Sequence, residues 1–202
     1  ESSNVAIQLY EVLERNNFDV FIDTHSIDKG EEFQEELWHR MTDCDVILML
    51  NTKEFLKSDW CKQELDKAHV KRIGIIHLLW PDCDFENFAH LAFSMKLKNA
   101  DFDKPLFSDL SEGRLKQTII PEIINLVESA RARNLASRQD ALITEFTQAA
   151  HNNNVNVNLQ HSRYISQDLS DNKRIIYIPT VGVPQSINCQ NSQKLTAKIE
   201  KG

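Results

Sequence analysis

The first 134 residues alternate between two patterns of hydrophobic and polar positions. Apolar residues recur at steps of three and four over residues 2–17, and this spacing predicts an amphipathic helix that stops at an Asn-Asn pair. Nearly all-apolar runs at residues 45–50 and 72–80 predict strands covered on both faces of a sheet. A shorter run rich in Phe, Val and Ile at residues 18–23 predicts one more strand.

Helical spacing returns between and after these runs. It predicts helices at residues 31–44, from Ser58 onward and at residues 111–134, where Pro121 either kinks the last helix or marks its true start. Residues 81–105 fit a loop with short helical turns. The order of helix, strand, helix, strand, helix, strand favours right-handed crossovers, and so an open parallel sheet with helices on both faces. An open parallel sheet that starts with a helix has lost, or never had, its first central strand, so we expect the chain to begin partway into this domain.

The pattern changes after residue 134. We therefore divide the chain into a first domain, residues 1–134, and a small α+β element, residues 135–202. The second part shows a helical pattern at residues 138–153 and strand patterns at residues 154–160 and 173–185. So short a segment makes a marginal core by itself. We interpret it as a regulatory or oligomerisation element fused to the first domain, or as a fragment.

The composition of the chain argues against several classes of function. The chain has 202 residues, 41% of them hydrophobic, and a formal net charge of −7. An acidic chain without a Lys/Arg cluster does not suit direct nucleic-acid or membrane binding. No run approaches the roughly 18 apolar residues of a membrane span, and the N-terminal stretch has no signal-peptide layout. These features predict a cytoplasmic protein.

The cysteines and histidines are not spaced as metal ligands usually are. The seven histidines include no i, i+4 pair, and the four cysteines form no C-x-x-C motif. We therefore expect no metal site and no disulfide framework. The cysteines are Cys44, Cys61, Cys83 and Cys189.

The stretch SDWCKQEL, residues 58–65, carries the candidate chemistry. If Ser58 caps a helix, then Trp60 and Glu64 lie one turn apart at the border of its apolar stripe. A carboxylate in that position can be partly desolvated beside an aromatic wall and still reach a ligand. The alternative is an ordinary surface glutamate at helical spacing.

Three segments taken together resemble a TIR domain. They are FDVFIDTHSIDKGEEFQEEL, DVILMLNTKEFLKSDWCKQEL and IGIIHLLW, within residues 3–80, and the helix up to residue 134 is a plausible end of the domain. The resemblance implies a flavodoxin-like sheet and a polar BB loop, here Thr24 to Gly30. Many TIR domains, bacterial ones in particular, cleave NAD, and in those the glutamate four residues after the tryptophan is catalytic. That residue is Glu64 here.

The implied reaction suits a carboxylate. Breaking the bond between nicotinamide and ribose expels a neutral base from a cation and leaves positive charge on the sugar. A fixed anion beside the developing oxocarbenium ion, with hydrogen bonds to the ribose hydroxyls, stabilises that transition state. Glu64 could supply both, with NAD as a substrate and no cofactor.

The resemblance implies supporting roles for other residues. Trp60 would line the substrate pocket, and Asp23 with Phe33 would flank the BB loop. The alternatives are core packing for Trp60 and Phe33, and the end of a strand for Asp23.

Within the BB loop, three residues are candidates for contacts with the substrate or for shaping the loop. Ser26 and Lys29 could reach phosphates, although any solvated loop contains such residues. Gly30 would supply a backbone conformation that other residues avoid. The resemblance implies that adenine and phosphate contacts commonly come from the loop after the first strand, which we expect to lie outside this sequence.

Two functions of different classes follow, with a third of less weight. The first is an NAD glycohydrolase or ADP-ribosyl cyclase that is activated by self-association through the BB loop, as in bacterial antiviral defence. The second is a non-catalytic signalling adaptor that acts by TIR–TIR association. The third is a flavodoxin-like nucleotide or response-regulator domain, for which Asp23 alone is an insufficient acidic cluster.

Overall fold

The computed structural model divides the chain into two compact units, Glu1–Asn134 and Leu135–Gly202. For residues 3, 59–64 and 198–199 it describes only the backbone. No described helix combines the length and apolarity that crossing a bilayer requires. The residues described are 3–22, 44–52, 59–70, 72–83, 93–103, 113–169, 173–182 and 186–199.

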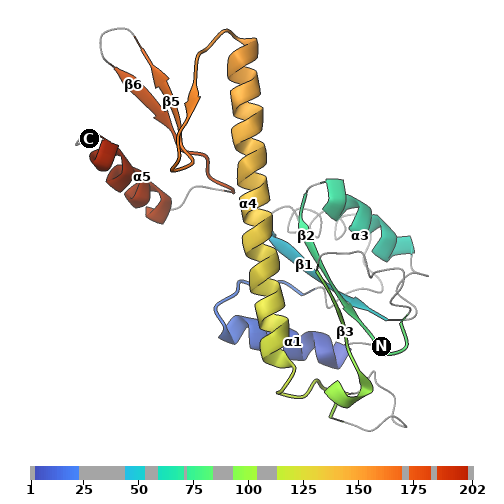
Figure 1. Ribbon diagram of the computed structural model, residues 1–202. Helices are drawn as coiled ribbons and strands as arrows, with labels where there is room; N and C mark the ends of the chain where they lie inside the picture. The colour runs from blue at the N-terminus through green and yellow to red at the C-terminus, as the bar shows by residue number, and fades with distance from the viewer. Residues whose placement is uncertain are drawn as a thin grey trace. The chain divides into compact units, whose positions relative to one another are not determined.

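The first unit contains a parallel sheet of three strands in the order β1-β2-β3 (Figure 1). Strands β1, Val46–Asn51, and β2, Gly74–Leu79, confirm the two apolar runs as strands. They pair in register from Val46↔Gly74 to Asn51↔Leu79. The third strand, β3, Ser94–Lys96, was not predicted, because its three residues carry no periodic apolar signal and owe their conformation to pairing with β2.

Helices cover both faces of this sheet. On one face lie α1, Ser3–Arg15, and the first half of α4, Ile120–Asn152, which bury Val5, Leu9 and Ile123 against β2. On the other face α3, Asp59–Val70, packs Ala68 against Ile47 and Ile75. This confirms the predicted flavodoxin-like α/β arrangement, with apolar strands buried from two sides.

Polar contacts hold α4 against the start of β1. Asn134 Nδ2 donates to the Asp45 carbonyl oxygen at 2.7 Å, and Arg131 Nε lies 2.8 Å from Asp45 Oδ2. Gly74 permits this close approach, because a Cβ there would lie 3.0 Å from Val46 Cγ1 and 3.2 Å from Asn134 Cβ. The end of the first unit is thereby tied to its sheet.

The strand predicted at residues 18–23 is wrong over the described part of that stretch. Residues 18–22 belong to no strand, although Phe18 and Val20 pack against the core cluster that contains Leu13 and Ile76. Their composition suits a strand, but strand geometry needs a neighbouring backbone for its hydrogen bonds. In the described part of the chain, no strand pairs with them.

The helix predicted at residues 111–134 begins later. Leu115 is not helical but forms an isolated bridge with Phe102, and α4 starts at Ile120 with Pro121 in its first turn. Proline suits this position because the first amides of a helix have no intrahelical partner. The helix predicted separately at residues 138–153 is the second half of the same 33-residue α4.

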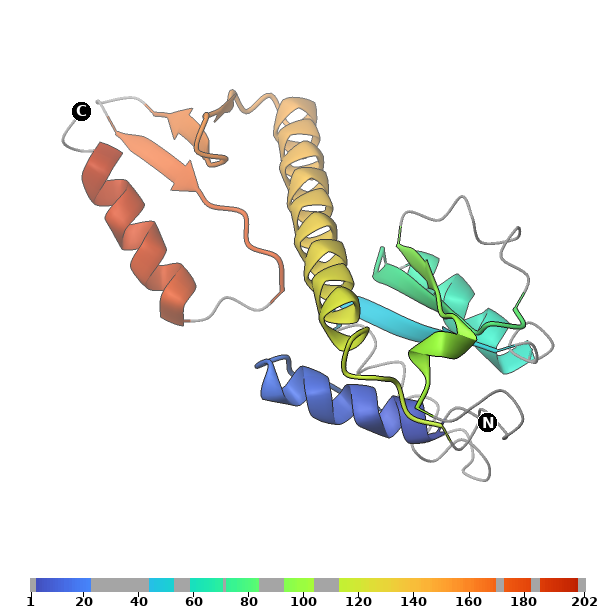
Figure 2. The same cartoon turned by 60° about the horizontal axis from the view of Figure 1, so that its bottom comes forward.

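The second unit combines the end of α4 with an antiparallel sheet and a last helix. The sheet has the order β4-β5-β6, formed by Asn158–Leu159, Ile165–Asp168 and Arg174–Tyr177. Helix α5, Ser186–Ile199, follows β6 in the chain (Figure 2). This is a small α+β fold, as predicted, although neither β5 nor α5 was predicted as an element.

Candidate functional site

Helix α3 begins on the carboxyl side of the sheet. Strand β1 ends at Asn51, and α3 starts eight positions later at Asp59. In a parallel β/α sheet, ligands bind at the carboxyl ends of the strands, next to the N-terminal ends of the helices that follow them. Trp60 and Glu64 therefore belong to a helix that follows the carboxyl end of β1.

Glu64 has a defined place along this helix. It lies one turn before Ala68, whose side chain is fully buried against Ile47 and Ile75. Asp66, two residues further on, is exposed. The backbone of α3 thus confirms the helical spacing between Glu64 and Ala68, and the position of Glu64 at the border of the apolar stripe stays a prediction. The side chains of Trp60, Cys61 and Glu64 lie outside the described residues.

The remaining predicted site residues lie outside the described part of the chain. The BB loop, Thr24 to Gly30, belongs to this group, as do the residues that flank it. Their roles as substrate contacts stay predictions. These residues are Asp23, Ser26, Lys29, Gly30 and Phe33.

A buried polar pair lies near the carboxyl ends of β1 and β2. His77 Nδ1 is 3.2 Å from Asn51 Oδ1, and the two residues are 3% and 0% exposed. Because an amide oxygen only accepts, the His77 Nδ1–H donates. Asn51 Nδ2 has no hydrogen-bond partner among the residues the structure describes. The pair lies on the face of the sheet that α3 covers, because Asn51 and His77 are an even number of residues from Ile47 and Ile75, which pack with Ala68.

Burial keeps the imidazole of His77 uncharged at neutral pH. It lowers the pKa of His77 to about 4, with a smaller contribution from the nearby charge of His69. At neutral pH the imidazole therefore carries no charge and acts as a hydrogen-bond partner rather than as an acid. Sequence reasoning missed the pair, although each residue interrupts or ends an otherwise apolar strand, and that interruption is a readable signal.

Other reactive side chains are scattered. Of the described cysteines, Cys83 is buried, Cys189 is exposed and Cys44 is intermediate. Over the described ranges, no three His, Cys, Asp or Glu side chains come together in a group that could hold a metal ion.

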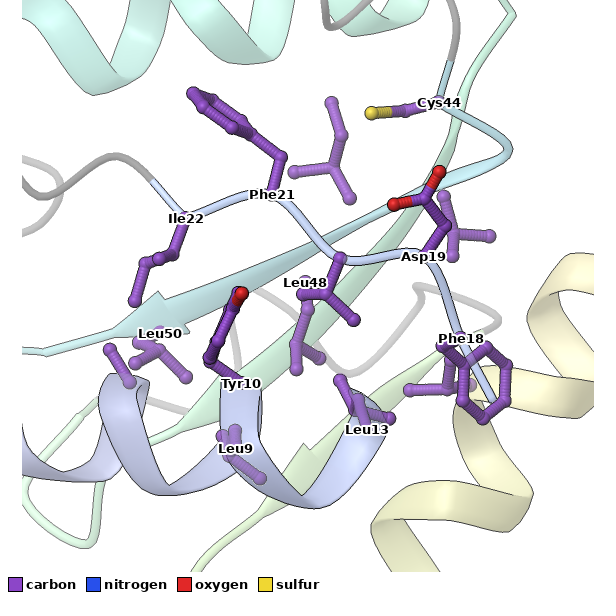
Figure 3. A pocket seen from close by; sticks show the side chains of 15 residues that line it. Leu9, Tyr10, Leu13, Phe18, Asp19, Phe21, Ile22, Cys44, Leu48 and Leu50 are labelled. Carbon is purple, nitrogen blue, oxygen red and sulfur yellow. The ribbon is translucent and has the colours of Figure 1, made fainter. Parts of the chain in front are cut away.

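An apolar cavity of about 300 Å³ lies on the face of the sheet that α1 covers (Figure 3). It is bordered by α1, by residues 18–22 and by β1. Its lining residues include no Lys, Arg or His and one carboxylate, that of Asp19, so the lining does not resemble a site for a negatively charged nucleotide.

The parallel sheet, the helices on both faces and a candidate site at the carboxyl ends of the strands define a flavodoxin-like α/β domain. The sequence profile of the TIR domain matches residues 1–115, which is more than half of the chain. The chain therefore belongs to the TIR domain family, and the resemblance drawn from its sequence motifs is confirmed. No curated protein matches it.

Proposed function

We propose that this chain cleaves NAD into nicotinamide and ADP-ribose or a cyclic variant, with Glu64 as the catalytic carboxylate. The proposal is supported by membership of a family that includes NAD-cleaving enzymes. The observation on which it depends is the position of α3. This helix begins after the carboxyl end of β1, and Glu64 lies in it one turn before Ala68, which packs on the sheet.

The proposed reaction requires a fixed negative charge from Glu64. Nicotinamide leaves as a neutral base, so no proton donor is needed for its departure. A carboxylate held beside C1 of the ribose stabilises the positive charge that develops there. Trp60 would form a wall of the same pocket, and the BB loop of residues 24–30 would close over it.

Glu64→Gln tests the assignment because it keeps the shape and removes the charge. We expect the rate of nicotinamide release from NAD to fall about 100- to 1,000-fold, the usual effect of deleting one preorganised electrostatic group. Asp66→Asn is the matched control, because it removes an exposed carboxylate from the same helix. Equal rates for the wild type and Glu64→Gln would refute the role of Glu64.

Protein concentration tests a second part of the proposal. TIR domains commonly self-associate, and we propose that assembly through the BB loop completes the pocket and activates the enzyme. The specific rate of NAD cleavage should then rise with protein concentration. We place this activity in bacterial antiviral defence, where loss of NAD arrests an infected cell.

The competing function is that of an adaptor that associates with other TIR domains without catalysis. It rests on the same family membership and gives Glu64 no role. No nicotinamide release by concentrated wild-type protein, even after forced self-association, would favour the adaptor and exclude the enzyme.

A further inference from the structure

Asn51 has an unused hydrogen-bond donor at the carboxyl end of β1. Its side chain is fully buried, and its Nδ2 has no partner within the described ranges of the chain. Its Oδ1, in contrast, accepts from His77 Nδ1 at 3.2 Å. This contact restricts the plane of the Asn51 amide and so the direction of its N–H groups. A buried donor with a fixed direction and no partner is a group that a ligand can satisfy.

The geometry of the sheet puts Asn51 at the level of the first turn of α3. Asn51 is four residues beyond Ile47, so both side chains lie on the face that α3 covers. Because β1 and β2 are parallel, the helix that connects them runs antiparallel to both. Four strand residues span about 13 Å, a length that a helix covers in about nine residues. Counted back from Ala68, which packs with Ile47, this length ends at Asp59, the first residue of α3.

Two kinds of donor therefore lie at the same edge of the sheet. The first amides of α3 have no partner within the helix, and Asn51 Nδ2 lies at their level. Thr52, the next residue after Asn51, is only half-buried, so this edge lies close to the surface. Ligands of parallel β/α sheets bind at this place.

The buried pair of Asn51 and His77 suits an uncharged ligand group. Burial lowers the pKa of His77 to about 4, so neither side chain carries a charge at neutral pH. A phosphate would lose its hydration here without gaining a cation from the pair, which is costly. An uncharged oxygen or nitrogen acceptor takes the hydrogen bond without that cost. Within NAD this leaves the ribose hydroxyls and the two bases.

The distance along α3 selects among these groups. The backbones of Asp59 and Glu64 are five residues apart in α3, which is about 7.5 Å along the helix axis. In the proposed reaction Glu64 acts at C1 of the ribose and binds its hydroxyls, and nicotinamide is bonded to that carbon. The carboxamide extends from the nicotinamide ring, whereas adenine lies at the opposite end of the dinucleotide. The carboxamide oxygen is therefore the acceptor that suits a donor at this distance.

We propose that Asn51 is a specificity-determining residue that donates a hydrogen bond from Nδ2 to the carbonyl oxygen of the nicotinamide carboxamide. This inference rests on the NAD-cleaving function proposed above. The contact satisfies the buried donor of Asn51 and selects dinucleotides whose pyridinium ring carries a carbonyl group.

A double-mutant cycle between protein and ligand tests this contact. Binding is measured by calorimetry in the Glu64→Gln variant, so that the dinucleotide is not consumed. The ligands are NAD, its 3-acetylpyridine analogue, which keeps the carbonyl group, and its 3-methylpyridine analogue, which lacks it. NAD and the acetylpyridine analogue should bind with similar Kd, and the methylpyridine analogue should bind about tenfold more weakly.

Adding Asn51→Leu should raise the Kd for NAD about tenfold and make the Kd values of the three ligands similar, because only the pair of groups forms the bond. Asn156→Leu removes an exposed asparagine side chain and should leave the pattern unchanged. If Asn51→Leu weakens NAD and the methylpyridine analogue by the same factor, Asn51 contacts another part of the ligand or none, and the inference is overturned.

A second measurement needs no substitution at Asn51 and so does not depend on the folding of that variant. The side-chain NH₂ signals of Asn51 in a ¹⁵N–¹H spectrum should shift with NAD and with the acetylpyridine analogue, and stay in place with the methylpyridine analogue. Equal shifts with all three ligands, or none with any, would overturn the contact.

The outcomes separate this inference from the proposed function. Cleavage of NAD by the wild type without coupling in the cycle would overturn the Asn51 contact alone. Coupling in a protein that does not cleave NAD would support the contact and overturn the catalytic role of Glu64. Absence of NAD binding by both the wild type and Glu64→Gln would overturn both.

Discussion

His77 is a titratable side chain inside a buried strand, so it couples stability to pH. Its pKa is lowered to about 4 in the folded chain, against an ordinary value of 6.5. Between these values the unfolded chain binds a proton that the folded chain does not. The free energy of unfolding should therefore fall as the pH drops from 6.5 to 4, by up to about 3 kcal/mol from this residue.

The variant His77→Gln removes this titration and keeps a side chain that can hydrogen-bond Asn51. Urea unfolding at several pH values between 4 and 7 should give a flatter dependence than in the wild type. His151→Gln changes an exposed histidine and is the control. A wild-type slope that persists in His77→Gln would assign the pH dependence to other groups.

Asn51 is the other residue of this buried polar pair. Its oxygen has His77 as a partner, and its Nδ2 is buried without one among the described residues. A buried donor left unpaired typically costs about 1–3 kcal/mol. This cost offsets what the His77–Asn51 hydrogen bond contributes to stability.

At the scale of elements, one side chain connects α1 by hydrogen bonds to the segment that precedes α4. Gln8 is 5% exposed, and its amide satisfies both backbone groups of Leu115. Nε2 donates to the Leu115 carbonyl oxygen, and Oε1 accepts from the Leu115 N–H, each at 2.8 Å. This contact joins residues 107 positions apart and replaces the strand partner that Leu115 lacks on that side.

Gln8→Leu should destabilise the first unit by about 2–4 kcal/mol, because it leaves a buried N–H and a buried C=O unpaired. The measurement is the urea midpoint followed by tryptophan fluorescence. Gln117→Leu makes the same substitution at an exposed position two residues after Leu115. Equal midpoints for the two variants would show that the Gln8 contact does not stabilise α1.

At the scale of the whole molecule, the two compact units meet within α4, between Asn134 and Leu135. All three tryptophans, Trp38, Trp60 and Trp80, belong to the first unit. In the second unit the Phe146 and Tyr177 rings lie 4.7 Å apart between centroids, joining α4 to β6. Optical and exchange probes can therefore follow each unit separately.

Phe146→Ala should weaken the second unit by about 1–2 kcal/mol through the lost ring contact and burial. Amide exchange in residues 158–177 should accelerate, while the tryptophan-detected midpoint stays unchanged. Gln8→Leu should show the reverse pattern. A tryptophan-detected midpoint that falls with Phe146→Ala would show that the two units unfold as one.

Several elements were predictable from the sequence because their signal lies in their own residues. The spacing of Val5, Leu9 and Leu13 defines the apolar face of α1, and the mostly apolar runs of β1 and β2 mark buried strands. The motif around Trp60 and Glu64 is likewise a local signal, and it indicates both the family and helix α3.

Tertiary structure alone decided the rest, because sheet pairing joins segments that are distant in the chain. Residues 18–22 have the composition of a strand but no strand beside them among the described residues, whereas Ser94–Lys96 has no strand signal and becomes β3 by pairing with β2. The His77–Asn51 pair and the Gln8 contact with Leu115 also bring distant positions together. Local periodicity determines which segments are helical or apolar, and long-range hydrogen bonding and packing decide which of them become neighbours.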